Sequence, residues 1–208
     1  MADLYEGSVA AFILAGGKSS RMGSDKAFVK LDNRTLLAHA MDLARSVTPE
    51  VRIVGAAAKF AAFGPVVEDM FRGCGPLGGI HAALRASQTE LNLVLAVDVP
   101  FVSMAFVQYL VTRARNSGSS LATVPRAAGG WQPLCAVYRR EFAEAAEDAL
   151  RAGTYKIDAL FNVVQVQAIE EEELAEAGFS PGLFRNLNTP DDLQAARERK
   201  TENHELRS

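Results

Sequence analysis

A glycine-bearing loop rich in positive charge follows the first apolar segment of the chain. Residues 9–14 are entirely apolar, and Gly16 and Gly17 come almost directly after them. Glycines at such a place let the backbone approach a ligand and leave amides free to face phosphate oxygens. The loop also carries three cations within nine positions, namely Lys18, Arg21 and Lys26. A triphosphate is the ligand that this combination suits best.

The order of residues in this loop excludes two common nucleotide-binding motifs. It lacks the G-x-x-x-x-G-K-[ST] order of a Walker loop and the G-x-G-x-x-G order of a dinucleotide fingerprint. A lone Gly-Gly pair is usually a flexible turn with solvated lysines beside it. An arginine and a second lysine at this spacing after a strand favour the phosphate loop instead.

A single carboxylate, Asp98, follows the most strongly apolar segment of the chain. That segment, residues 91–97, reads LNLVLAV and predicts a buried strand. A carboxylate at the end of such a strand is costly unless it is paired. Mg²⁺ is an apt partner, because it takes few carboxylates and completes its shell with water and phosphate oxygens. The alternative is a turn or helix-capping aspartate before Pro100.

Two further polar or glycine-rich segments follow predicted strands. Glu68 and Asp69 come after the short apolar stretch 65–67, where a surface turn is the alternative interpretation. The segment from Gly75 to Gly79 reads GPLGG and opens a predicted helix, whose N-terminus can hold an anion. On sequence alone, tight packing at a helix start explains these glycines equally well.

The elements that must position these residues alternate between strand and helix. Apolar runs predict strands at 9–14, 51–54, 65–67, 91–97, 120–124 and 134–138. Helical spacing predicts helices around 37–44, 76–86, 103–114 and 139–152, with Ser103 as a cap, and another helix opening at Thr189. This order is typical of a single α/β domain, with a Rossmann-like, mostly parallel open sheet and helices on both faces. Ligands bind such sheets beyond the carboxyl ends of the strands.

Composition and charge narrow the class of protein. The chain has 208 residues, 49% of them hydrophobic, and a formal net charge of -3. We therefore expect no coating of nucleic acid or of an anionic membrane, which would need a basic excess. The N-terminus has no signal-peptide pattern and no apolar run is long enough for a membrane span, so a cytoplasmic location is expected. We expect Cys74 and Cys135 to be free thiols.

The loop at residues 14–26, LAGGKSSRMGSDK, resembles the signature of the molybdenum cofactor guanylyltransferase family. The resemblance continues in family order through GPLGG at 75–79, DVPF at 98–101, QPL at 132–134 and NLNTP at 186–190. It implies a Rossmann-like nucleotidyltransferase domain, here at residues 9–196, with an N-terminal extension at 1–8 and a polar tail at 197–208. It also implies transfer of GMP from Mg²⁺-bound GTP to the phosphate of molybdopterin, with release of pyrophosphate.

The resemblance also implies a role for individual residues. The catalytic residues would be Arg21, Lys26 and Asp98, with Asp98 holding the Mg²⁺ cofactor. Nucleotide contacts would come from Leu14, Ala15, Gly16, Gly17, Lys26, Asp69 and Asp98. The acceptor, molybdopterin or molybdenum cofactor, would lie against Arg21, Gly75, Gly79, Asn186 and Asn188. An enzyme with this function could also bind transiently to proteins that insert molybdenum or that mature molybdoenzymes.

Two differences from related sequences keep alternatives open. Some family members carry an asparagine that touches the nucleotide near residue 55, where this chain has Gly55 and Ala56. Related cytidylyltransferases usually read LAAG where this chain reads LAGG, which favours GTP over CTP. The alternatives are a transferase that uses CTP, as molybdopterin cytidylyltransferase does, or a sugar phosphate acceptor. A non-catalytic nucleotide-binding regulator is an alternative of another class.

Overall fold

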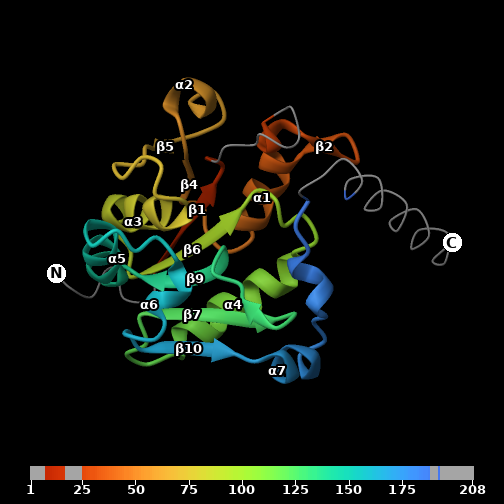
Figure 1. Cartoon of the computed structure of the whole chain (residues 1–208). Coiled ribbons are helices and arrows are strands. Elements are labelled where there is room, and N and C mark those ends of the chain that lie inside the picture. Colours follow the sequence, from red (N-terminus) through yellow and green to blue (C-terminus); the bar gives the residue numbers. More distant parts are fainter. Residues whose placement is uncertain (1–7, 17–24, 188–191, 193–208) are drawn as a thin grey trace, which may run out of the picture.

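The computed structural model describes residues 8–16, 25–187 and 192. Its main sheet has the order β10-β7-β9-β6-β1-β4-β5, and β8 pairs with β7 beside this path (Figure 1). All neighbouring pairs along the path are parallel except those made by β9, which is antiparallel to β6 and to β7. The strands are β1 (Val9–Leu14), β4 (Val51–Val54), β5 (Val66–Val67), β6 (Leu91–Ala96), β7 (Ala122–Ala127), β8 (Gly130–Trp131), β9 (Cys135–Arg139) and β10 (Val166–Ile169).

Helices cover both faces of the sheet (Figure 1). Alternate residues of β1 enter two separate cores, with Ile13 in one and Phe12 in the other, as the two-residue period of a strand requires. The first core contains residues of α1 (Leu36–Arg45), α4 (Met104–Arg115) and α7 (Glu171–Glu176). The second contains residues of α3 (Pro76–Ala86), α5 (Phe142–Arg151) and α6 (Ile157–Leu160).

Shorter elements lie around the ends of the strands. The 3-10 helix η1 (Lys26–Phe28) precedes a small hairpin of β2 (Lys30–Leu31) and β3 (Arg34–Thr35), and α2 (Ala57–Phe60) lies between β4 and β5. A second 3-10 helix, η2 (Pro181–Phe184), comes late in the chain. Within the described part of the chain, we find no helix long and apolar enough to cross a membrane.

The sequence-based prediction of the fold is confirmed in its class and in most of its elements. The sheet is open and mostly parallel, and Ser103 caps α4 by accepting from the amide of Phe106 at 3.2 Å. Both cysteines are free thiols, and burial raises the pKa of Cys135 to about 12. The predicted helix opening at Thr189 and the tail at 197–208 lie outside the described residues.

Two features were not predicted. Strand β9 runs antiparallel because β7 turns back through β8 at Ala128 and Gly129, whose positive φ angles of 52° and 76° suit a tight hairpin. No element was predicted for residues 153–169, where the structure has α6 and β10. Strand β10 is a partly buried edge strand, so its hydrophobic pattern is weak.

The order of strands creates a crevice beside β1. From β1 the chain passes through α1 to β4 on one side, whereas β6 lies on the other side of β1. The connections leave the carboxyl ends of β1 and β6 in opposite directions, so the loops after these two strands separate. In open α/β sheets this reversal of strand order is where ligands bind.

Candidate active site

A cavity of about 870 Å³ opens at the carboxyl ends of β6, β1, β4 and β5. It brings together most of the described residues that the sequence assigned to a site. These are Leu14, Ala15, Gly16, Lys26, Asp69, Gly75, Gly79 and Asp98. Gly17, Arg21 and Asn188, which were also assigned, lie outside the described residues.

An ion pair between Lys26 and Asp98 marks one end of the cavity. The Lys26 Nζ lies 3.1 Å from the Asp98 Oδ2, and each side chain is only about a fifth exposed, at 20% and 21%. Asp98 follows β6, and Lys26 is the first residue of η1. Asp25 fixes this short helix, because its carboxylate accepts from the Ala27 amide at 3.2 Å and pairs with Lys59 at 3.0 Å. The cation and the carboxylate are thus held together at the switch point of the sheet.

Two glycines bring the loops after β1 and β4 close together. The amides of Ala15 and Gly16 both donate to the carbonyl of Val54, at 3.0 and 3.1 Å. A Cβ on Gly55 would lie 2.7 Å from the Phe60 ring, so no other residue fits there without movement. The amides of the first two loop residues are therefore engaged in bonds to the neighbouring strand.

Asp69 joins the loop after β5 to the first turn of α3. Its Oδ1 accepts from the Phe71 amide at 2.8 Å, and the carboxylate lies against Gly78. Burial raises the pKa of Asp69, while the Phe71 hydrogen bond and the positive charges of His81 and Arg72 act in the opposite direction. A partly buried carboxylate at this wall is therefore held in place by backbone contacts.

The glycines of the GPLGG segment permit close approach at the start of α3. Gly75 precedes the helix with a φ of 71°, a conformation that suits glycine. A Cβ on Gly79 would lie 3.3 Å from the Leu14 Cδ2 and 3.5 Å from the Val54 Cγ1. Packing of α3 on β1 and β4 thus accounts for Gly79, while contact of Gly75 and Gly79 with an acceptor stays a prediction.

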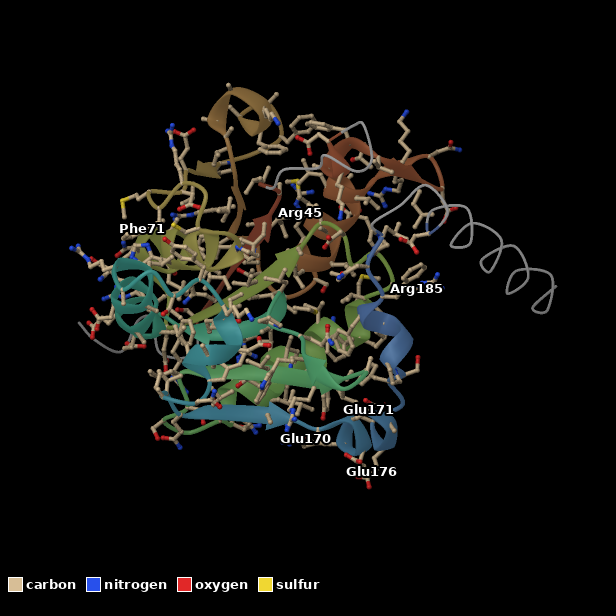
Figure 2. All side chains as sticks on the ribbon, in the orientation of Figure 1. Arg45, Phe71, Glu170, Glu171, Glu176 and Arg185 are labelled. Carbon is tan, nitrogen blue, oxygen red and sulfur yellow. The ribbon has the colours of Figure 1, made fainter. Side chains whose placement is uncertain are left out.

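Asn186 is placed near the site but is not among the residues that line the cavity. The amide of the next residue, Leu187, donates to the Asp98 carbonyl at 2.9 Å. Leu187 is fully buried, whereas Asn186 is exposed. Figure 2 shows Arg185 and Phe71 on opposite sides of the molecule, so the C-terminal segment and the Asp69 loop approach the site from different directions.

Two charged residues that line the cavity were given no role from the sequence, although Glu68 was singled out together with Asp69. Glu68 and Arg72 lie on the wall formed by the loop between β5 and α3. The Glu68 Oε1 accepts from the Ala57 amide at 3.0 Å, at the start of α2. Both residues follow a predicted strand, and this position was the one feature of the sequence that indicated a place in the site. It was not decisive, because charged residues after strands are also common in surface turns.

Comparison with known proteins agrees with this fold. The family model described as "MobA-like NTP transferase domain" matches residues 11–168. A probable molybdenum cofactor guanylyltransferase of Pelotomaculum thermopropionicum is 36% identical, covering 89% of this chain and 90% of the relative. A molybdenum cofactor guanylyltransferase of Syntrophotalea carbinolica is 32% identical, covering 88% of each. The crystal structure of molybdopterin-guanine dinucleotide biosynthesis protein A from Archaeoglobus fulgidus matches with a TM-score of 0.81 at 28% identity, covering 93% of this chain and 99% of that one.

The fold and the site define a nucleotidyltransferase. Within that class, the chain belongs to the family of MobA-like NTP transferase domains, whose members named above are guanylyltransferases of the molybdenum cofactor. The family resemblance of the sequence motifs is thereby confirmed.

Proposed function

We propose that this enzyme transfers GMP from GTP to the phosphate of molybdopterin and releases pyrophosphate. The observation that carries the proposal is the Lys26–Asp98 pair, held at 3.1 Å in a cavity at the switch point of the sheet. A regulator that only binds a nucleotide needs no cation and carboxylate side by side where the phosphates would lie. The names of the relatives supply the choice of acceptor.

The reaction would be an in-line displacement at the α-phosphorus. An oxygen of the acceptor phosphate forms a bond to that phosphorus, and the bond from the α-phosphorus to the bridging oxygen of the β-phosphate breaks. The electron pair leaves with pyrophosphate. A phosphate monoester is already anionic at pH 7, so the acceptor needs no general base. The work of the protein is therefore positioning and stabilisation of charge.

Lys26 supplies positive charge where the pyrophosphate develops. Its ammonium group pairs with Asp98, and its backbone is part of the short helix η1, which Asp25 caps. Because the pair is mostly shielded from water, the charge acts on a phosphate more strongly than an exposed lysine would. Arg21 is proposed to hold the acceptor phosphate.

The residues around Asp98 fit a magnesium ion delivered with the nucleotide. Among the described residues there is no group of three His, Cys, Asp or Glu side chains that would form a metal site of protein ligands alone. One carboxylate beside a triphosphate site is the donor set that suits Mg²⁺, which takes its other ligands from phosphate oxygens and water. Asp98 would bind the ion. When bound, Mg²⁺ would neutralise negative charge on the phosphates.

The proposal is tested by combining the protein with molybdopterin, Mg²⁺ and each nucleoside triphosphate in turn. We expect pyrophosphate release that depends on molybdopterin and is fastest with GTP. Turnover with CTP equal to or better than with GTP would place the chain among cytidylyltransferases. Nucleotide binding without pyrophosphate release under any condition would favour a regulator.

A further inference from the structure

We infer that Glu68 selects the base of the nucleotide, by accepting from the N1–H and 2-amino groups of guanine. The inference rests on the proposed function and supplies a contact that the sequence left open at Gly55 and Ala56, where some family members have an asparagine. Glu68 lies on the cavity wall, one residue after β5. Its role in the reaction would be recognition of the substrate, not chemistry at the phosphorus.

The order of strands places Glu68 at the right distance from the phosphates. Asp98 follows β6, Gly16 follows β1, Gly55 follows β4 and Glu68 follows β5, and these four strands are adjacent in the sheet. Neighbouring strands are about 4.8 Å apart, so three steps span about 14 Å along the edge. A nucleotide with its phosphates at Lys26 and Asp98 therefore reaches the end of β5 with its base.

The hydrogen bonding of Glu68 leaves it able to bind a base. Within the described residues, the carboxylate makes one hydrogen bond, from the Ala57 amide to Oε1 at 3.0 Å. This contact fixes the orientation of the side chain and leaves Oε2 available. An ionised carboxylate only accepts, so it matches the two adjacent donors of guanine. The carboxylate is repelled by the lone pair at N1 of adenine and by the lone pair at N3 of cytosine, because these atoms are also acceptors.

Arg72, on the same wall of the cavity, offers hydrogen-bond donors that complement the acceptors of Glu68. Its side chain lines the cavity and is exposed, and it makes no ion pair among the residues that the structure describes. A guanidinium group is the most frequent partner of the guanine O6 and N7 acceptors. Acceptors from Glu68 and donors from Arg72 together present a polar surface that fits guanine and mismatches adenine and cytosine.

The test compares GTP with ITP, which differs only by the missing 2-amino group, in the wild-type protein and in Glu68→Gln. Glutamine can keep the bond from the Ala57 amide through its carbonyl oxygen, but its NH₂ group replaces the free acceptor with a donor. Both affinity by calorimetry and kcat/KM with molybdopterin are measured. The matched control is Glu144→Gln, which removes the same charge from an exposed position on α5.

We expect the wild-type protein to prefer GTP over ITP by about tenfold or more, the value of one good base contact. Glu68→Gln should reduce this preference to about unity, mainly through weaker GTP binding, while Glu144→Gln keeps it. Equal use of GTP and ITP by the wild-type protein would overturn the inference, as would an equal loss for both nucleotides in Glu68→Gln. If no nucleotide is transferred to molybdopterin, the proposed function fails, but the calorimetric comparison still decides the role of Glu68.

Discussion

The carboxylate of Asp69 occupies the space that a side chain on Gly78 would need. A Cβ at Gly78 would lie 2.7 Å from the Asp69 Oδ2 and 2.9 Å from the carbonyl oxygen of Phe71. Both are closer than a real carbon atom approaches such neighbours. The glycine in the first turn of α3 thus sets the position of an aspartate that lines the cavity.

Gly78→Ala should displace Asp69 and lower kcat/KM for GTP by about tenfold or more, because small misplacements near a reaction centre are costly. Stability should change less, since alanine gains about 1 kcal/mol over glycine inside a helix and offsets part of the clash. Steady-state kinetics and thermal unfolding measure the two effects. Gly182→Ala is the matched comparison, because this glycine is exposed, does not line the cavity, and its added Cβ would lie 3.5 Å from the Ser180 Oγ. Normal kinetics for Gly78→Ala would show that the position of Asp69 is unimportant.

Lys26→Ala should weaken binding of GTP and slow transfer. Loss of a charge-assisted phosphate contact in a partly closed cavity costs about 1.5–3 kcal/mol. Calorimetric titration with GTP and measurement of turnover check both parts. Lys156→Ala removes the same charge from an exposed position before α6 and should have no effect. If GTP affinity and turnover are unchanged in Lys26→Ala, the lysine serves only its ion pair with Asp98.

Asn186→Ala should impair use of the acceptor and leave GTP binding intact. The backbone beside this residue is fixed to Asp98 through the Leu187 amide, and Asn186 itself is exposed. Product yield at rising molybdopterin concentration should show a raised KM for molybdopterin, by about tenfold if one good hydrogen bond is lost. Asn162→Ala, also exposed, serves as the control. A collapse of GTP affinity in Asn186→Ala would contradict the assignment to the acceptor.

Glu147 should make stability depend on pH in the acid range. Hydrogen bonds from Arg151, from Arg85 and from His81 lower the pKa of Glu147 from 4.5 to about 2. The bonds from Arg85 and His81 join α5 to α3. A lowered pKa in the folded protein means that the carboxylate stabilises the fold above pH 4.5, and that this stabilisation is lost as the pH falls towards about 2. Glu147→Gln should therefore unfold at a lower temperature than the wild-type protein at pH 7.

The measurement is the unfolding temperature of both proteins from pH 7 down to about pH 2.5. The difference between them should shrink as the pH falls below 4.5. Glu144→Gln, on the same helix, is the control and should follow the wild-type curve. A difference that stays constant across this range would mean that the charge of Glu147 does not stabilise the packing of α3 on α5.

Much of the fold was predictable because its core strands are buried on both faces. Residues 9–14 are apolar throughout, residues 91–96 are apolar except for Asn92, and every one of them is buried in the structure. The antiparallel direction of β9 was not predictable from such a run, because strand direction depends on the connection before it. Here that connection is a hairpin in which Ala128, as well as Gly129, adopts a positive φ.

The candidate site was predictable where a functional residue directly follows a strand. Gly16, Asp69 and Asp98 all occupy such positions, and all line the cavity. Arg72 follows a strand less directly, and its place on the wall depends on the path of the loop between β5 and α3. Periodicity carries no information on the path of such a loop.

Transfer of GMP is best tested with GTP that carries a label on its α-phosphate. With molybdopterin and Mg²⁺, we expect this label to appear in a molybdopterin–guanine dinucleotide, identified by its mass, while a label on the γ-phosphate appears in pyrophosphate. Asp98→Asn, with an unchanged unfolding temperature, should form no dinucleotide. Label that remains in free GMP or GDP, or dinucleotide formation by Asp98→Asn at more than about a tenth of the wild-type rate, a loss of less than ~1.4 kcal/mol, would contradict the account.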